Sequence, residues 1–131
     1  MINRRQALAT LSLSSVALAA FQVLAADGQP FSRAAFDAAL KAGKPILIDV
    51  SAPWCPTCQA QAPILSELVK SPRFAGLTFF SVDFDSQKDV LRALRVQSQS
   101  TLLVFKGGAE VGRTVGDTSK ASIEALILRA I

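Results

Sequence analysis

Hydrophobic and polar residues follow two different periods along the chain. Short continuous apolar runs are typical of buried strands, and they predict strands at 45–50, 77–82 and 101–105. A further strand at 110–115 follows the Gly107-Gly108 turn and forms a hairpin with the third. Apolar residues spaced three and four apart predict helices at 33–42, 56–70, 86–94 and 119–130.

These elements alternate, which predicts an α/β domain with a central mixed sheet and helices on both of its faces. Residues 27–30 are expected to be a polar connector. In the second helix, one side should carry the inward-facing Ala60, Ile64, Leu65 and Leu68. Pro63 interrupts this pattern and is expected to kink the helix.

The first 25 residues predict an export signal. Arg4 and Arg5 precede an uncharged run rich in Ala, Leu and Ser, with small residues placed for cleavage after Ala25. The adjacent arginines also resemble a twin-arginine signal. The alternative is a retained inner-membrane anchor, because an apolar run of about 20 residues can span a bilayer. We therefore expect a periplasmic protein whose residues 1–25 are the signal.

Composition excludes several kinds of site. The 131 residues include two Cys and no His, so neither Ser-His-Asp nor Cys-His catalysis is available, and no four-Cys zinc site fits in one chain. We expect neither a metal nor a cofactor, and one domain over residues 26–131. With Arg4 and Arg5 set aside, 12 basic residues balance 10 acidic ones without a basic stripe, so we expect no nucleic-acid binding.

The segment 52–58, Ala-Pro-Trp-Cys-Pro-Thr-Cys, carries the candidate chemistry. Cys55 falls at a helix start, where free N–H groups and the helix dipole favour a thiolate. Cys58 follows one turn later and can close a disulfide with Cys55 or resolve a mixed disulfide. Pro56 costs no hydrogen bond in the first turn. A static disulfide, or half of a metal site shared between two chains, are the alternatives, but the helix start and the adjacent Trp54 favour redox catalysis.

At this point the chain resembles the thioredoxin-like family. The resemblance runs from Phe31 to Ile131 and rests on Asp49, Trp54-Cys55-x-x-Cys58, Pro63, the 101–105 strand and Gly116. It implies the thioredoxin fold, with Cys55 as the attacking thiol and Cys58 as the resolving thiol. It also implies that Asp49, buried beneath the pair, helps to take the proton from Cys58. Asp49 could instead be a purely structural buried acid.

The resemblance further implies a substrate-binding surface, formed by Trp54, Pro56, Thr57, Ser100 and Thr101. Trp54 could alternatively belong to the core. Ser100 stands where the family usually has a cis-proline, and a non-proline cis bond costs about 3–4 kcal/mol. We therefore expect a trans Gln99–Ser100 bond and an added hydroxyl near the sulfurs. Gly116 is expected to permit a close backbone approach.

The predicted function is that of an exported protein disulfide oxidoreductase. The Asp49 and Trp54 marks resemble reductive members of the family, which favours reduction of exported protein disulfides. The implied partners are protein thiols and disulfides together with a membrane thiol electron donor, and the protein is expected to be a monomer. A disulfide oxidase or isomerase, or a binding module without enzymatic activity, are the alternative functions.

Overall fold

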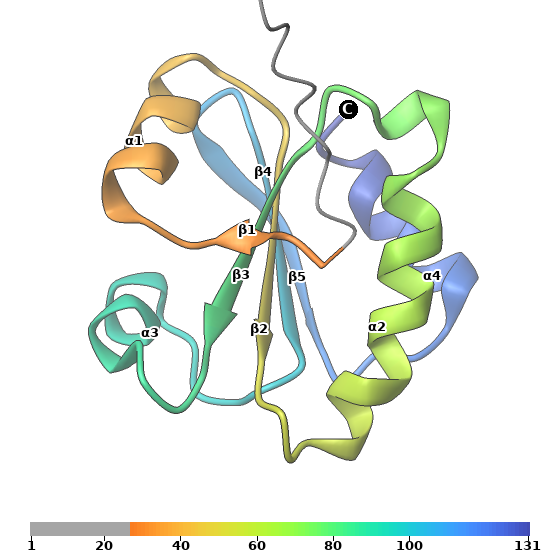
Figure 1. Ribbon diagram of the computed structural model, residues 1–131. Coiled ribbons are helices and arrows are strands. Elements are labelled where there is room, and N and C mark those ends of the chain that lie inside the picture. The colour runs from red at the N-terminus through yellow and green to blue at the C-terminus, as the bar shows by residue number, and fades with distance from the viewer. Residues whose placement is uncertain (1–26) are drawn as a thin grey trace, which may run out of the picture.

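The computed structural model describes residues 27–131, so the predicted export signal lies outside the described residues (Figure 1). The elements follow in the order β1 (Gln29–Pro30), α1 (Arg33–Lys41), β2 (Ile46–Ser51), α2 (Pro56–Val69), a 3₁₀ turn (Pro72–Phe74), β3 (Thr78–Asp83), α3 (Lys88–Leu94), β4 (Thr101–Lys106), β5 (Ala109–Val115) and α4 (Lys120–Leu128). The strands and helices predicted from hydrophobic spacing are all present. Within this part of the chain, no helix is long and apolar enough to cross a membrane.

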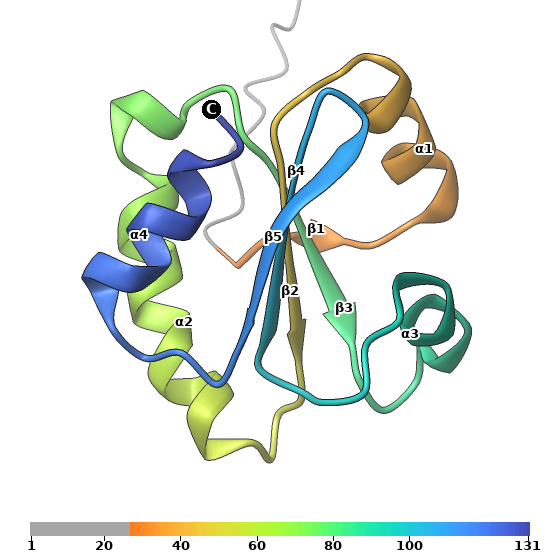
Figure 2. The ribbon, with the colours of Figure 1, turned by 180° about the vertical axis from the view of Figure 1, so that it is seen from behind.

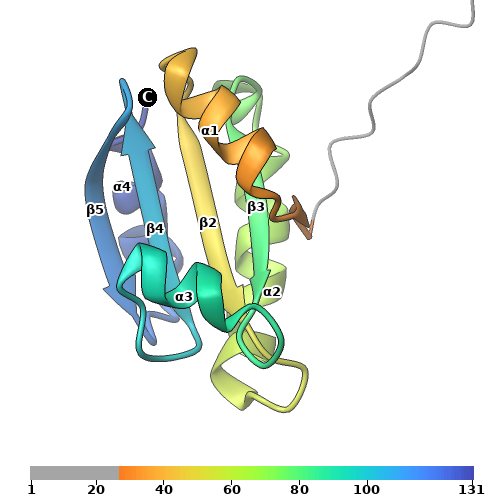
Figure 3. The same cartoon turned by 90° about the vertical axis from the view of Figure 1, so that its left-hand side faces the viewer.

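One mixed sheet of five strands, in the order β1-β3-β2-β4-β5, forms the centre of the fold. β3 runs parallel to both β1 and β2, whereas β4 is antiparallel to β2 and β5. Figure 3 shows α1 and α3 in front of this sheet and α2 and α4 behind it. The structure thus confirms the predicted α/β class, with a mixed sheet covered on both faces.

Each face of the sheet has its own hydrophobic core. On the α2 and α4 side, Leu47, Leu102 and Val104 pack against Leu65 and Ile127. On the α1 and α3 side, three aromatic rings meet: Phe36 lies edge-on to Phe80 and Phe105, with centroids 6.2 and 5.2 Å apart. Because β2 and β4 bury side chains on both faces, their sequences are apolar without alternation, which explains why they are visible as strands in the sequence.

The segment expected to be a polar connector contains the edge strand β1. Gln29 and Pro30 pair in parallel with Phe80 and Ser81 of β3. Proline is tolerated there because an edge strand need not donate on its outer side. Two residues are too few to show a period, so the sequence held no signal for this strand.

The second helix differs from the prediction in its buried face. Leu65 and Leu68 are buried as expected and Ile64 packs against the core, but Ala60 is exposed and Gln61 is buried in its place. The helix is continuous through Pro63 from Pro56 to Val69. Gln61 turns inward because its amide finds backbone carbonyl partners on neighbouring loops, described below.

Three connections gather at one end of the sheet. Figures 1 and 2 show the β2–α2, α3–β4 and β5–α4 loops together at the bottom of the molecule, opposite the C-terminus. The strand register explains this arrangement, because Thr101 at the start of β4 lies opposite both Val50 and Val115. Residues far apart in sequence therefore meet where α2 begins.

Candidate active site

Cys55 is the N-cap residue of α2. Its backbone is extended, and its sulfur accepts a 3.1 Å hydrogen bond from the backbone N–H of Cys58. A sulfur at this position also faces the positive end of the helix dipole, which favours the thiolate. Both cysteines are unpaired thiols in this structure, and Cys55 is 1% and Cys58 6% exposed.

The two thiols have opposite shifts in acidity. Burial alone raises the pKa of Cys55, but hydrogen bonding that involves the Cys58 side chain, the Ser100 hydroxyl and the nearby backbone outweighs it and leaves this pKa below its ordinary value. Burial raises the pKa of Cys58, and the neighbouring Cys55 raises it further. Cys55 is therefore the better nucleophile, and Cys58 keeps its proton until another group removes it.

Ser100 lies directly against both sulfurs. Its hydroxyl oxygen is 3.2 Å from the Cys55 sulfur and 3.0 Å from the Cys58 sulfur, and in each contact either atom can donate. No peptide bond within residues 27–131 is cis, as expected for Gln99–Ser100. Ser100 instead has φ of 62°, in the left-handed region that costs a non-glycine residue roughly 1–2 kcal/mol.

Hydrogen bonds on several sides hold Ser100 in this conformation. Its N–H donates to Val50 at 2.7 Å, and its carbonyl accepts from the N–H of Gly116 at 2.9 Å. The side-chain amide of Gln61 donates to the carbonyl of Asp117 at 2.7 Å and approaches that of Ser100 at 3.4 Å. Val50 in β2, Gln61 in α2 and the residues that directly follow β5 thus fix the serine in place.

Gly116 and Gln61 have roles that differ from those expected from the sequence. A Cβ on Gly116 would meet no atom within 4 Å, so no close approach requires glycine there. Glycine is favoured instead because the backbone has φ of 72°, in the left-handed region. Gln61 is a site residue that the sequence analysis does not predict. Its spacing could have indicated it, because Gln61 follows Cys58 by three residues and precedes Leu65 by four, which places all three on one helix face.

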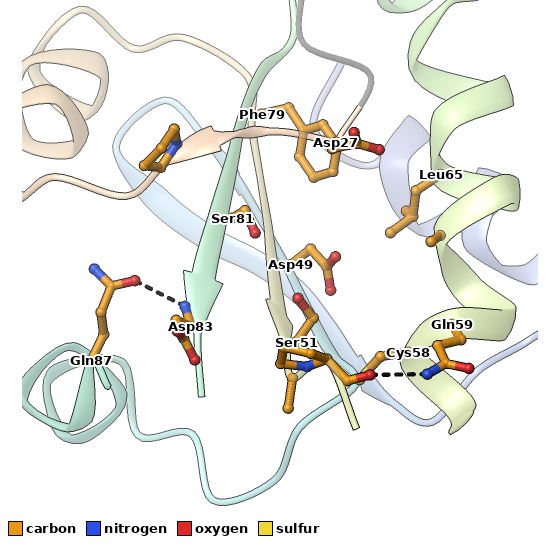
Figure 4. Close-up of a pocket in the computed structure, with 14 residues that line it drawn as sticks. Asp27, Asp49, Ser51, Cys58, Gln59, Leu65, Phe79, Ser81, Asp83 and Gln87 are labelled. Atoms are coloured by element: carbon orange, nitrogen blue, oxygen red, sulfur yellow. Dashed lines mark hydrogen bonds between the residues drawn. The ribbon is translucent and has the colours of Figure 1, made fainter. Parts of the chain in front are cut away.

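Asp49 faces a cavity of about 460 Å³ between β2, β3 and α2, whose lining includes Cys58 (Figure 4). One Asp49 carboxylate oxygen is buried without a hydrogen-bond partner. Burial raises the pKa of Asp49 to about 6. A carboxylate of that basicity is largely ionised at neutral pH and is still a better proton acceptor than an ordinary aspartate.

Trp54 lies on the surface beside the cysteines. It is 56% exposed, its ring packs edge-on against Phe84, and its Nε1 donates to Asp85 at 2.9 Å. Because these contacts already hold the ring, a substrate can bury apolar surface against it with little loss of side-chain entropy. Asp85 was not among the expected site residues, because nothing in the sequence pairs it with a tryptophan 31 residues away.

The other expected substrate residues are placed differently from one another. Pro56 is exposed and Thr57 half-buried, both next to Cys55 at the start of α2. Thr101 is buried, and its hydroxyl donates to the Ser98 carbonyl at 2.7 Å. Its side chain therefore stabilises the loop between α3 and β4.

Among residues 27–131, no group of three or more acidic, Cys or His side chains is arranged to hold a metal ion.

Comparison with known proteins agrees with this geometry. A sequence profile described as Thioredoxin matches residues 28–129. A Thioredoxin H-type of Fagopyrum esculentum is 41% identical over 81 residues, which cover 62% of this chain and 68% of that protein. A Thioredoxin H-type of Oryza sativa subsp. indica is 40% identical over 78 residues, and the chain spans 62% of its length.

The fold comparison gives the same answer. The crystal structure of Trxlp from Edwardsiella tarda EIB202 matches with a TM-score of 0.74 and 41% identity, over 76% of this chain and 96% of that one. Taken with the thiol pair at the start of α2, these matches show that the chain belongs to the thioredoxin family of protein disulfide oxidoreductases.

Proposed function

We propose that this protein is a thiol–disulfide reductase that acts on exported proteins outside the cytoplasm. The observation that carries the redox chemistry is the position of Cys55, a thiol with a lowered pKa that caps α2 and accepts a hydrogen bond from Cys58. The proposed direction rests on Asp49, which can accept the proton that the resolving thiol must lose.

The reaction has two steps. The Cys55 thiolate attacks a substrate disulfide, forms a mixed disulfide, and releases the other substrate sulfur as a thiolate. Cys58 then loses its proton to Asp49 and attacks the Cys55 sulfur. The Cys55–Cys58 disulfide forms, the second substrate sulfur leaves as a thiolate, and two electrons have passed from the pair to the substrate.

Single cysteine variants test this mechanism with insulin as substrate. Cys58→Ser should accumulate the mixed disulfide, which a non-reducing gel detects, whereas Cys55→Ser should form none. Insulin reduction should require both cysteines. Undiminished reduction by Cys55→Ser would exclude the mechanism.

The redox equilibrium with glutathione tests the direction. A potential near −270 mV supports a reductase, whereas a value near −120 mV would make the protein an oxidase. The redox state in the cell gives an independent measurement, because a membrane thiol donor would keep the pair reduced in an oxidising compartment. Rapid acid quenching followed by thiol alkylation should then find mostly reduced Cys55 and Cys58.

The proposed compartment rests on residues 1–25 alone. We expect the mature protein in the periplasmic fraction to begin at Ala26, which N-terminal mass spectrometry detects. Replacing Arg4 and Arg5 by lysine should block export if the signal is of the twin-arginine type. A mature protein that keeps Met1 and fractionates with the cytoplasm would exclude this proposal.

A further inference from the structure

The Ser100 hydroxyl is placed to serve both cysteines. It lies 3.2 Å from the Cys55 sulfur and 3.0 Å from the Cys58 sulfur, although Cys58 is 42 residues away in sequence. We propose that Ser100 is a catalytic residue whose single hydroxyl proton is donated to whichever of the two sulfurs carries the negative charge. This inference rests on the proposed two-step thiol mechanism.

In the reduced protein, the hydrogen bonds form a short chain. The Cys58 thiol donates to the Ser100 oxygen, and the Ser100 hydroxyl donates to the Cys55 thiolate. Both distances fit this arrangement, and a hydroxyl can accept and donate at the same time. The Ser100 contact also acts to lower the pKa of Cys55.

The arrangement reverses when the mixed disulfide forms. Cys55 then shares its electron pair with a substrate sulfur and no longer carries a charge. Once Cys58 has passed its proton to Asp49, the Ser100 hydroxyl rotates and donates to the Cys58 thiolate, which lies 3.0 Å away. The Cys58 thiolate attacks the Cys55 sulfur, and no proton is gained or lost by Ser100.

The backbone supports a functional role for Ser100. A serine with φ of 62° is strained, and strained residues persist where the surroundings hold them, often at functional sites. Here Val50, Gly116 and Gln61 provide those contacts. Ser100 is also 3% exposed, so its hydroxyl acts where water does not compete for the sulfurs.

One thermodynamic consequence follows. The Ser100 hydrogen bond to a thiolate exists only while the pair is reduced, so it stabilises the reduced protein relative to the disulfide. Ser100 should therefore make the pair more oxidising than it would be without the hydroxyl. The identity of this residue would then tune the equilibrium as well as the rate.

The test compares Ser100→Ala and Ser100→Gly with the wild type. Both variants remove the hydroxyl, but glycine also relieves the strain at positive φ. The control is Ser98→Ala, which removes a hydroxyl from the same loop. The pKa of Cys55 is read from the pH dependence of iodoacetamide alkylation and of thiolate absorbance at 240 nm. Neither readout depends on reduction of a protein substrate.

We expect both Ser100 variants to make Cys55 about tenfold less acidic, since a hydrogen bond to a charged group is lost. The equilibrium constant with glutathione should move toward the disulfide in both, and resolution of a preformed mixed disulfide should slow. Ser98→Ala should change none of these quantities.

Three outcomes would overturn the assignment. They are an unchanged Cys55 pKa in both Ser100 variants, a shift in Ser100→Ala that Ser100→Gly does not share, or an equal shift in Ser98→Ala. The second would show that strain acts, and the third that any change in the loop suffices. If these results occur while the wild type still reduces insulin through Cys55, the proposed function stands and only the role of Ser100 fails.

Discussion

The indole nitrogen of Trp54 donates a 2.9 Å hydrogen bond to the carboxylate of Asp85, which joins the loop before α2 to the loop after β3. The same tryptophan ring lies edge-on against Phe84, with centroids 6.4 Å apart. These two contacts hold an exposed aromatic side chain beside Cys55. The surface next to the nucleophile therefore depends on a loop that contributes no sulfur chemistry.

Asp85→Ala is expected to loosen Trp54 with little effect on stability. A single exposed hydrogen bond is worth about 1 kcal/mol or less, so the free energy of unfolding should fall by no more than this amount. The chain has one tryptophan, so fluorescence anisotropy reports on this ring alone and should fall. Asp37→Ala, on the exposed face of α1, is the control and should leave the anisotropy unchanged. Unchanged anisotropy in Asp85→Ala would show that packing on Phe84 suffices.

Asp49→Asn is expected to stabilise the folded protein at pH 8 but not at pH 4. The pKa of Asp49 is raised from 3.8 to about 6 by burial, so the folded state holds the proton more tightly than the unfolded state. The contribution of Asp49 to stability is then greatest below pH 4 and is lost as pH rises through 6, by about 3 kcal/mol for this shift. Urea unfolding of the reduced protein at both pH values measures the gain. Resolution of a mixed disulfide should slow in the same variant.

Asp83 provides a control of opposite sign beside the same cavity. The N–H of Asp85 and the Ser86 side chain lower the pKa of Asp83, so its charge favours folding above its unfolded pKa and this contribution is lost as pH falls. Asp83→Asn should therefore give no stabilisation at pH 8. Equal stabilisation by both variants would indicate general charge reduction and would contradict the specific role of burial at Asp49.

Alkylation of the reduced protein at pH 7 should modify Cys55 before Cys58. The pKa of Cys55 is lowered and that of Cys58 is raised, and the thiolate is the reactive form. Peptide mass spectrometry after brief iodoacetamide treatment gives the order. The preference should shrink in urea, where the helix N-terminus and both sulfur contacts are lost. Preferential labelling of Cys58 would reverse the assignment of nucleophile and resolving thiol.

Gly112→Ala should destabilise the packing of β5 on α4. A Cβ at this position would lie 2.8 Å from Leu126 Cδ1 and 3.0 Å from Arg129 Nη1, so side chains of α4 must move. Overpacking of this kind costs about 1–3 kcal/mol. Gly76→Ala is the matched control, because its Cβ would meet nothing within 4 Å, and it should change stability by less than about 0.5 kcal/mol. Denaturant unfolding compares the two, and equal stability would show that α4 moves at no cost.

Features that depend on neighbouring residues in the chain could be predicted from the sequence. The continuous apolar runs of β2 and β4 show strands buried on two faces, and Ser32 caps α1 by accepting a hydrogen bond from the N–H of Ala35, three residues away. Cys55 at the start of α2 follows from a strand, a short turn and a helix in succession. Fold class and thiol chemistry could therefore be predicted, because helix caps and side-chain periods are local properties.

The residues that surround the two sulfurs come together only in the folded protein. Ser100 reaches them only because β4 pairs with β2, its left-handed φ follows from hydrogen bonds to Val50 and Gly116, and Gln61 turns inward because Asp117 offers it a carbonyl. The contact between Asp85 and Trp54 likewise joins two loops that are distant in the sequence. These contacts join residues 16 to 56 positions apart, so they depend on how strands and loops assemble and leave no periodic trace in the sequence.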